Sequence, residues 1–314
     1  MTKTILYIIL PCYNEEEIIN QTFEELIGVY NKLWKKELIS QESRIVFVDD
    51  GSSDETWNKI LTLKEKSDTV LAIKLAQNVG HQNAILAGLL TYKDQADCCI
   101  TIDADLQDDI TVIETMVKKY QEGNEIVYGV RNKRVTDTFF KKQTALAFYK
   151  LMKIMGVNII FNHADYRLAS GKALNELAKF KEVNLFLRSM FPLLGFKTTE
   201  VYYDRLKRIG GNTKFSLKKM LSFSLDGITS FSIVPLRLIT FLGLSIFFFS
   251  LLFIVYAIYS YLVLNTIKGW ASTALPIYFL GGIQLFCVGI IGEYIGKIYK
   301  EVKQRPRYIV EKTI

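Results

Sequence analysis

Two long stretches without a charged residue constrain this chain more than any other feature of its 314 residues. Leu238 to Ile267 runs for 30 residues without a charge, and Gly269 to Gly292 adds 24 more. A helix of 30 residues is about 45 Å long, whereas the hydrocarbon core of a bilayer is about 30 Å thick. Since two such helices rarely occur inside a soluble domain, the sequence predicts a transmembrane hairpin over residues 233–299.

Basic residues flank both predicted spans and indicate their orientation. The connector between the spans carries one cation, Lys268. The outer flanks carry many more, namely Lys214, Lys218, Lys219 and Arg237 before the first span and Lys297, Lys300, Lys303, Arg305, Arg307 and Lys312 after the second. Because cytoplasmic flanks are enriched in Lys and Arg, both chain ends are predicted to be cytoplasmic.

Residues 214–232 are predicted to form a juxtamembrane amphipathic helix, and residues 300–314 a basic cytosolic tail. The net charge of +7 fits an anionic membrane surface better than nucleic acid.

Residues 1–213 have the pattern of an α/β domain with a largely parallel, doubly wound sheet. Apolar runs of strand length alternate with helical stretches, the runs being Ile5–Leu10, Arg44–Val48, Val70–Leu75, Cys98–Ile102, Glu125–Val130 and Lys197–Tyr203. Such sheets bind ligands beyond the carboxyl ends of their strands. Neither a Gly-x-Gly-x-x-Gly motif after the first strand nor a P-loop is present, which argues against a dinucleotide-binding enzyme and an ATPase.

An acidic segment, residues 103–109, follows the fourth apolar run. Alternate side chains of an extended segment share a side, so Asp103, Asp105 and Gln107 would lie together. Two carboxylates and one amide oxygen suit Mg²⁺ or Mn²⁺. The alternative is that the acids cap the following helix, and this is the interpretation for Asp108 and Asp109. For Asp103 and Asp105 the residues alone leave both readings open.

Other polar residues also follow strand ends. Tyr13, Asn14 and Glu15 follow the first strand, Asp50 ends the second, and Asn78 follows the third. Asp50 is suited to accept hydrogen bonds from a nucleotide base or ribose.

Three further groups of polar residues have two readings each. Asp165 and Arg167 lie in a polar insert that fits a structural ion pair or a place in the cleft. His81 and His163 are interpreted as structural residues. The cations around Gly210 and Gly211 form either an anion-binding loop or a solvated charge run.

With these segments placed, the chain resembles the membrane-bound polyisoprenyl-phosphate glycosyltransferases of glycosyltransferase family 2, including bactoprenol-phosphate glucosyltransferases and dolichyl-phosphate mannose synthases. Six motifs in the order of that family carry the resemblance along the whole chain, namely residues 11–16, 48–54, 78–82, 103–108, 165–168 and 205–215. The resemblance implies a GT-A fold, a nucleotide-diphosphate sugar donor, a lipid phosphate acceptor and inversion at the sugar carbon. The two-span hairpin is more similar to the bacterial transferases.

The resemblance also implies roles for individual residues. The donor site would comprise Pro11, Tyr13, Asn14, Glu15, Asp50, Asn78, Asp103 and Ala104. Asp105 and Gln107 would bind Mg²⁺ or Mn²⁺ with Asp103 beside them, and Asp165 is the candidate base. The acceptor phosphate would be bound by Arg131, Arg167, Arg205, Arg208 and Lys214. Gly210 to Phe215 departs conservatively from the family's Ala-Gly-x-Ser-Lys-Tyr and keeps its cation.

The predicted reaction is transfer of a hexose, with UDP-glucose the first choice, to undecaprenyl phosphate at a bacterial cytoplasmic membrane. UDP-N-acetylglucosamine, UDP-galactose and GDP-mannose stay open as donors, because no motif encodes hydroxyl recognition. A processive polysaccharide synthase would need more spans, and a sugar sensor without catalysis would not need the acids. Because a phosphate monoester is already largely ionised at neutral pH, a strong base is unnecessary. The spans and the juxtamembrane helix also offer surfaces for a homo-oligomer.

Overall fold

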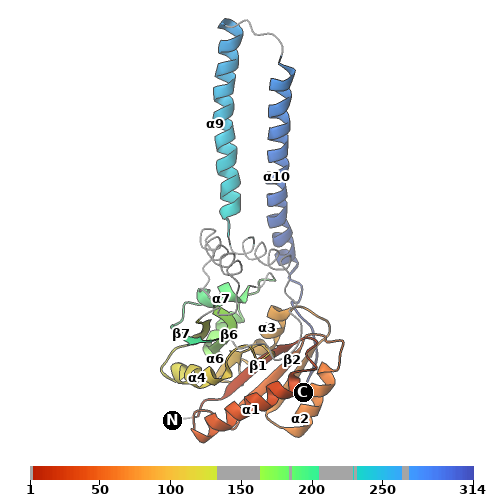
Figure 1. Cartoon of the computed structure of the whole chain (residues 1–314), viewed down its shortest axis with the longest axis vertical. Coiled ribbons are helices and arrows are strands. Elements are labelled where there is room, and N and C mark those ends of the chain that lie inside the picture. The colour runs from red at the N-terminus through yellow and green to blue at the C-terminus, as the bar shows by residue number, and fades with distance from the viewer. Residues whose placement is uncertain (1–2, 133–162, 184–185, 205–228, 230–231, 264–268) are drawn as a thin grey trace. The chain divides into compact units, whose positions relative to one another are not determined.

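The computed structural model describes residues 3–132, 163–183, 186–204, 229, 232–263 and 269–314 (Figure 1). These residues belong to two compact units. The first holds a β-sheet and residues 304–314, and the second holds the two long C-terminal helices. The predicted helical stretch over residues 135–161 and nearly all of the predicted juxtamembrane helix lie outside the described residues.

The described strands of the first unit form one mixed sheet in the order β7-β5-β6-β4-β1-β2-β3-β8. Their bounds are β1 Leu6–Cys12, β2 Arg44–Asp49, β3 Val70–Leu75, β4 Cys98–Thr101, β5 Ile126–Arg131, β6 His163–Ser170, β7 Thr198–Tyr203 and β8 Val310–Thr313. β1 to β4 pair in parallel, as do β5 and β7. β6 is antiparallel to β4 and β5, and β8 is antiparallel to β3. The predicted α/β class with a largely parallel sheet is confirmed.

Helices cover both faces of the sheet, as the burial of β1 on both sides requires. The helices of this unit are α1 Ile19–Lys35, α2 Thr56–Lys66, α3 His81–Tyr92, α4 Ile113–Gln121, α6 Gly171–Leu177 and α7 Leu187–Leu193. Alternate residues of β1, such as Leu6 and Ile8, share a core with the apolar stripe of α1. On the other face α3 approaches β1 so closely that a Cβ on Gly88 would lie 2.3 Å from Ile9 Cγ2.

Strands β6 and β8 were not predicted. The segment containing β6 reads as a polar insert because it carries Asp165 and Arg167, yet these two charges pair with each other and the strand fits between β4 and β5. Part of the predicted basic tail is β8, which adds to the edge of β3 with reciprocal backbone bonds of 2.9 Å between Ala72 and Ile314. Lys74 and Glu311 form an ion pair of 3.0 Å across the same edge.

The second unit contains the helices α9 Val234–Val263 and α10 Trp270–Lys303. Within them, Val234–Leu252 and Phe279–Lys303 are long and apolar enough to cross a membrane. α10 ends where Gln304 takes a left-handed φ of 46° and Pro306 follows, both common features of a helix C-terminus.

Candidate active site

The loops that follow β1 and β2 are hydrogen-bonded to each other at the carboxyl edge of the sheet. The backbone N–H of Asn14 donates to Ser52 Oγ at 3.0 Å, and the N–H of Ser53 donates to Asn14 Oδ1 at 2.9 Å. Glu15 N–H donates to Thr56 Oγ1 at 2.9 Å. Asn14 has a φ of 52°, a conformation that Asn tolerates better than most residues. The structure therefore places Tyr13, Asn14 and Glu15 at this edge, and their role in a donor site stays a prediction.

Two predicted donor residues have no exposed side chain for the donor to contact. Pro11 is buried within β1. Ala104 is only 4% exposed, and its carbonyl accepts a bond of 2.8 Å from Thr22 Oγ1 on α1. The bond from Thr22 fixes the segment at Ala104, and the place of both residues in the donor site stays a prediction.

Asp50 joins the loop after β3 to the end of β2. Its Oδ1 accepts from Val79 N–H at 2.8 Å, and its Oδ2 accepts from Gly80 N–H at 3.0 Å and from Asn78 Nδ2 at 3.1 Å. Asp50 is 3% exposed, and burial raises the pKa of its carboxyl group. Asp50 and Asn78 therefore hold these two loops together, and their contact with the nucleotide stays a prediction.

Gly51 is needed where these loops meet. Its φ is 67°, and a Cβ there would lie 2.6 Å from Asn78 N. We expect Gly51→Ala to lower the free energy of unfolding by about 2 kcal/mol and the melting temperature of the full chain by roughly 5 °C. Gly28→Ala in α1 is the matched control, because nothing lies within 4 Å of the added Cβ and helices favour Ala over Gly. Equal melting temperatures for the two variants in detergent would contradict the prediction.

The acidic segment leaves the sheet as a turn rather than as a continued strand. β4 ends at Thr101, and Leu106 has a left-handed φ of 52°. Burial still alternates along the segment, because Asp103, Asp105 and Gln107 are partly exposed while the residues between them are buried. The three predicted oxygen donors therefore reach the surface, although not from a regular strand.

Asp103 has an oxygen that lacks a hydrogen-bond donor. Its Oδ1 is buried without a hydrogen bond, and His81 Nε2 lies 3.3 Å from it. Burial, helped by Asp108, Asp165 and Asp105, raises the pKa of Asp103 to about 6, although His81 opposes the shift. A carboxylate in such surroundings is a favourable place for a cation.

The grouping of potential metal ligands was compared across the residues that the structure describes. Among the described residues, no three His, Cys, Asp or Glu side chains are grouped so that they could hold a metal ion. Mg²⁺ and Mn²⁺ typically bind few protein oxygens and fill their other positions with water and phosphate. Asp105, Gln107 and the buried oxygen of Asp103 thus fit a divalent ion by the chemistry of their donors.

The two acids interpreted as helix caps have different roles. Asp109 is a cap, because its Oδ1 accepts from Thr111 N–H at 2.9 Å. Asp108 is not: it is 2% exposed, and its Oδ1 accepts from Arg131 Nη2 at 2.9 Å and from the hydroxyl of Tyr203 at 2.6 Å. This buried pair fixes Arg131, whose side chain remains 22% exposed at the end of β5. The acceptor role of Arg131 stays a prediction.

Asp165, on β6, is surrounded by three basic side chains. Arg167 Nη2 lies 2.5 Å from its Oδ1, Arg188 Nη2 lies 3.1 Å from its Oδ2, and His81 Nε2 lies 3.7 Å from its Oδ2. Burial alone would raise the pKa of Asp165, but the charges of Arg188, Arg167 and His81 outweigh it and hold the pKa well below the ordinary 3.8. These ion pairs therefore contribute stability above pH 4, which is lost only in strong acid as the pH falls through the lowered pKa. Such a carboxylate is a weak base.

Arg167 does not face the cleft. It is 1% exposed, donates to the carbonyl of Leu187 at 3.2 Å and lies 4.6 Å from the centre of the Phe191 ring. Arg167 therefore orients Asp165, and its contact with the acceptor phosphate stays a prediction. Arg205, Arg208 and Lys214 lie outside the described residues.

Two residues at the site were not predicted to belong to it. Arg188 on α7 has a side chain 31% exposed, and no motif marks it in the sequence. His81 begins α3, is 43% exposed and lies between Asp103 and Asp165. Next to His81, Gln82 Oε1 accepts from Leu187 N–H at 2.8 Å and ties α3 to α7. The position of His81 at the end of the loop that follows β3 was a signal, because the loops after the parallel strands meet at one edge.

Comparison with known proteins gives two family matches. Residues 7–178 match Glycosyl transferase family 2, and residues 234–298 match the GtrB C-terminal hairpin. The chain is 52% identical over 310 residues to the uncharacterized glycosyltransferase YkoT of Bacillus subtilis (strain 168), covering 99% of this chain and 92% of that protein. It is 39% identical to the SfII prophage-derived bactoprenol glucosyl transferase of Shigella flexneri, covering 98% and 97%. It is 38% identical to the prophage bactoprenol glucosyl transferase homolog of Escherichia coli (strain K12), covering 98% of each.

Proposed function

Because this chain belongs to glycosyltransferase family 2 and carries a GtrB-type C-terminal hairpin, we propose that it transfers glucose from UDP-glucose to a polyprenyl phosphate such as undecaprenyl phosphate. It is a glycosyltransferase with a GT-A-like fold, as the resemblance implied. The observation that carries the proposal is similarity along almost the whole chain, hairpin included, to proteins named bactoprenol glucosyl transferase. UDP as the nucleotide rests on the family resemblance.

The acidic segment is the proposed metal and diphosphate site. Asp105 and Gln107 would hold Mg²⁺ or Mn²⁺, with Asp103 beside them. When bound, such an ion offsets the negative charge that develops on the leaving diphosphate. Tyr13, Asn14 and Glu15, fixed by the loop after β2, bind the nucleoside end of the donor in this proposal.

Asp165 and Arg188 are proposed to act on the reacting groups as a fixed ion pair. Since the lowered pKa makes Asp165 a weak base, it accepts hydrogen bonds from donor hydroxyls instead of removing a proton. The acceptor phosphate monoester is itself largely ionised and supplies the nucleophilic oxygen. The partly exposed guanidinium of Arg188 can donate to a phosphate while it holds Asp165.

The membrane arrangement is part of the same proposal. α9 and α10 would span the bacterial cytoplasmic membrane with both chain ends in the cytoplasm, because Lys- and Arg-rich flanks stay on the cytoplasmic side. Arg205, Arg208 and Lys214 precede α9 in the sequence, so they would meet a lipid phosphate near the bilayer surface.

The test is a donor panel with purified full-length protein in proteoliposomes containing undecaprenyl phosphate and Mn²⁺. UDP-glucose, UDP-galactose, UDP-N-acetylglucosamine, GDP-mannose and dTDP-glucose would be compared, with the lipid product identified by mass. We expect glucosyl-phosphoryl-undecaprenol from UDP-glucose. A different preferred donor would overturn the sugar assignment, and no lipid-linked sugar from any donor would overturn the acceptor class.

A further inference from the structure

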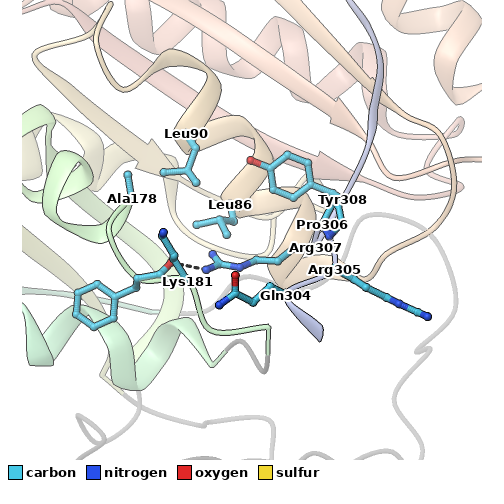
Figure 2. A pocket seen from close by; sticks show the side chains of 10 residues that line it. Leu86, Leu90, Ala178, Lys181, Gln304, Arg305, Pro306, Arg307 and Tyr308 are labelled. Carbon is cyan, nitrogen blue, oxygen red and sulfur yellow. Dashed lines mark hydrogen bonds between the residues drawn. The ribbon is translucent and has the colours of Figure 1, made fainter. Parts of the chain in front are cut away.

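A cavity of about 350 Å³ lies within the sheet unit (Figure 2). Its walls come from α3, from the segment after α6 and from residues 304–308, which lead into β8. The lining residues Leu86 and Leu90 are five and nine residues beyond His81 on α3. None of the lining residues that the structure describes belongs to the candidate active site above.

The lining combines an apolar wall with basic residues. Leu86, Leu90 and Ala178 form the apolar part, and Tyr308 directs its ring toward the two leucines (Figure 2). Lys181, Arg305 and Arg307 supply the cations, and none of the described lining residues is acidic. Arg307 donates to the carbonyl of Phe180, which fixes its guanidinium, whereas Arg305 points away from the other side chains. Such a lining suits a ligand with an anionic group attached to an apolar body.

The C-terminal segment that lines the cavity directly follows a predicted membrane helix, and this indicates where such a ligand would come from. Gln304, the first lining residue of the C-terminal segment, directly follows Lys303, the last residue of α10. Residues 297–307 carry five cations, Lys297, Lys300, Lys303, Arg305 and Arg307, and one acid, Glu301. Basic residues at the cytoplasmic end of a membrane helix attract the anionic lipids of that leaflet.

We propose that this cavity binds the headgroup of an anionic phospholipid, at a site separate from that of the acceptor. The phosphodiester of the headgroup faces Lys181 and Arg307, and the acyl carbons nearest to it contact Leu90 and Ala178. Soluble phosphate shares the anionic chemistry but not the apolar part, so the wall of α3 favours the lipid. A bound headgroup would connect α3 to the segment that runs from α10 to β8.

Native mass spectrometry of the full chain in detergent tests this, because it counts bound lipids without donor or acceptor and so does not depend on the proposed reaction. Phosphatidylglycerol and phosphatidylcholine would be titrated separately. We expect one phosphatidylglycerol adduct that phosphatidylcholine does not match. Lys181→Gln should weaken that adduct about fivefold, the effect of one cation near a membrane surface. Ala178→Leu should abolish it without changing any charge, by filling the cavity.

Lys300→Gln is the matched control, since it removes the same charge from α10 outside the cavity. It should leave the tight adduct unchanged. Equal phosphatidylglycerol binding by the wild type and Ala178→Leu would overturn the proposal, as would an equal loss in Lys300→Gln. A melting temperature raised by inorganic phosphate alone, and sensitive to Lys181→Gln, would overturn the lipid assignment in favour of a soluble anion.

Discussion

Replacing Asp105 by Asn is expected to reduce sugar transfer roughly a thousandfold, because a metal ion at a leaving group supplies several kcal/mol of transition-state stabilisation. Asp105 is partly exposed, and its Oδ1 accepts from Gln107 N–H at 3.2 Å. Asn can keep that bond through its amide oxygen, so the turn should survive while the charge is lost. The measurement is the initial rate of lipid-linked sugar formation in proteoliposomes across a Mn²⁺ titration.

Asp109→Asn provides the matched control for Asp105→Asn. Asp109 is an acid of the same segment, but it caps the helical turn after it, and Asn is an equally good cap. Its rate should stay within about twofold of the wild type, since a cap change of this kind is worth a few tenths of a kcal/mol. A wild-type rate for Asp105→Asn, together with turnover that EDTA does not affect, would show that no metal acts through this segment.

Replacing Arg167 by Met is expected to lower the free energy of unfolding by about 3 kcal/mol and the melting temperature by roughly 10 °C. Met fills a similar volume, but the Leu187 carbonyl loses its donor and Asp165 loses its shortest ion pair. Transfer should fall as well, because Asp165 is then held only by Arg188 and His81. Thermal unfolding of the full chain in detergent and the transfer rate are the two measurements.

Two further variants separate the causes of the Arg167→Met effect. Arg44→Met removes an arginine whose guanidinium donates to the nearby carbonyls of Gln41 and Ser43, and it should melt within about 2 °C of the wild type. Adding Asp165→Asn to Arg167→Met should recover part of the lost stability without restoring transfer, because the buried carboxylate that has lost its shortest ion pair is no longer charged. If Arg167→Met melted at the wild-type temperature, Arg167 would not be the buried anchor described here.

The sequence predicted strands wherever burial on both faces made the chain uniformly apolar. β1 and β4 are of this kind. β6 was missed because two charged residues, Asp165 and Arg167, interrupt it. Their charges compensate each other through an ion pair in the folded protein, and a hydropathy pattern does not reveal such a contact. β8 was missed because a short strand such as Val310–Thr313 is fixed by its partner, β3, which lies more than two hundred residues earlier.

Those site residues that directly follow a predicted strand could be predicted from the sequence. The acids after β4 and the loop after β1 were found in this way, and the alternation along Asp103 to Gln107 holds in burial although the strand has ended. What could not be predicted were contacts made across the fold. In the sequence Asp108 resembles its neighbour Asp109, and only the contact with Tyr203 of β7 distinguishes the two. Arg188 of α7 belongs to the site because it contacts Asp165 of β6, which the sequence does not indicate.

The pairing of β8 with β3 has a consequence for biosynthesis. The ribosome makes β3 early, but its edge partner emerges only after both α9 and α10 have been translated. Domains generally fold from the N-terminus during synthesis, and an unpaired strand edge is prone to join other chains. In the nascent sheet the edge of β3 therefore stays unpaired until the hydrophobic hairpin has left the ribosome. A chain that stalls in the hairpin would carry an almost complete catalytic unit with that edge still uncovered, which gives quality control a means to recognise it.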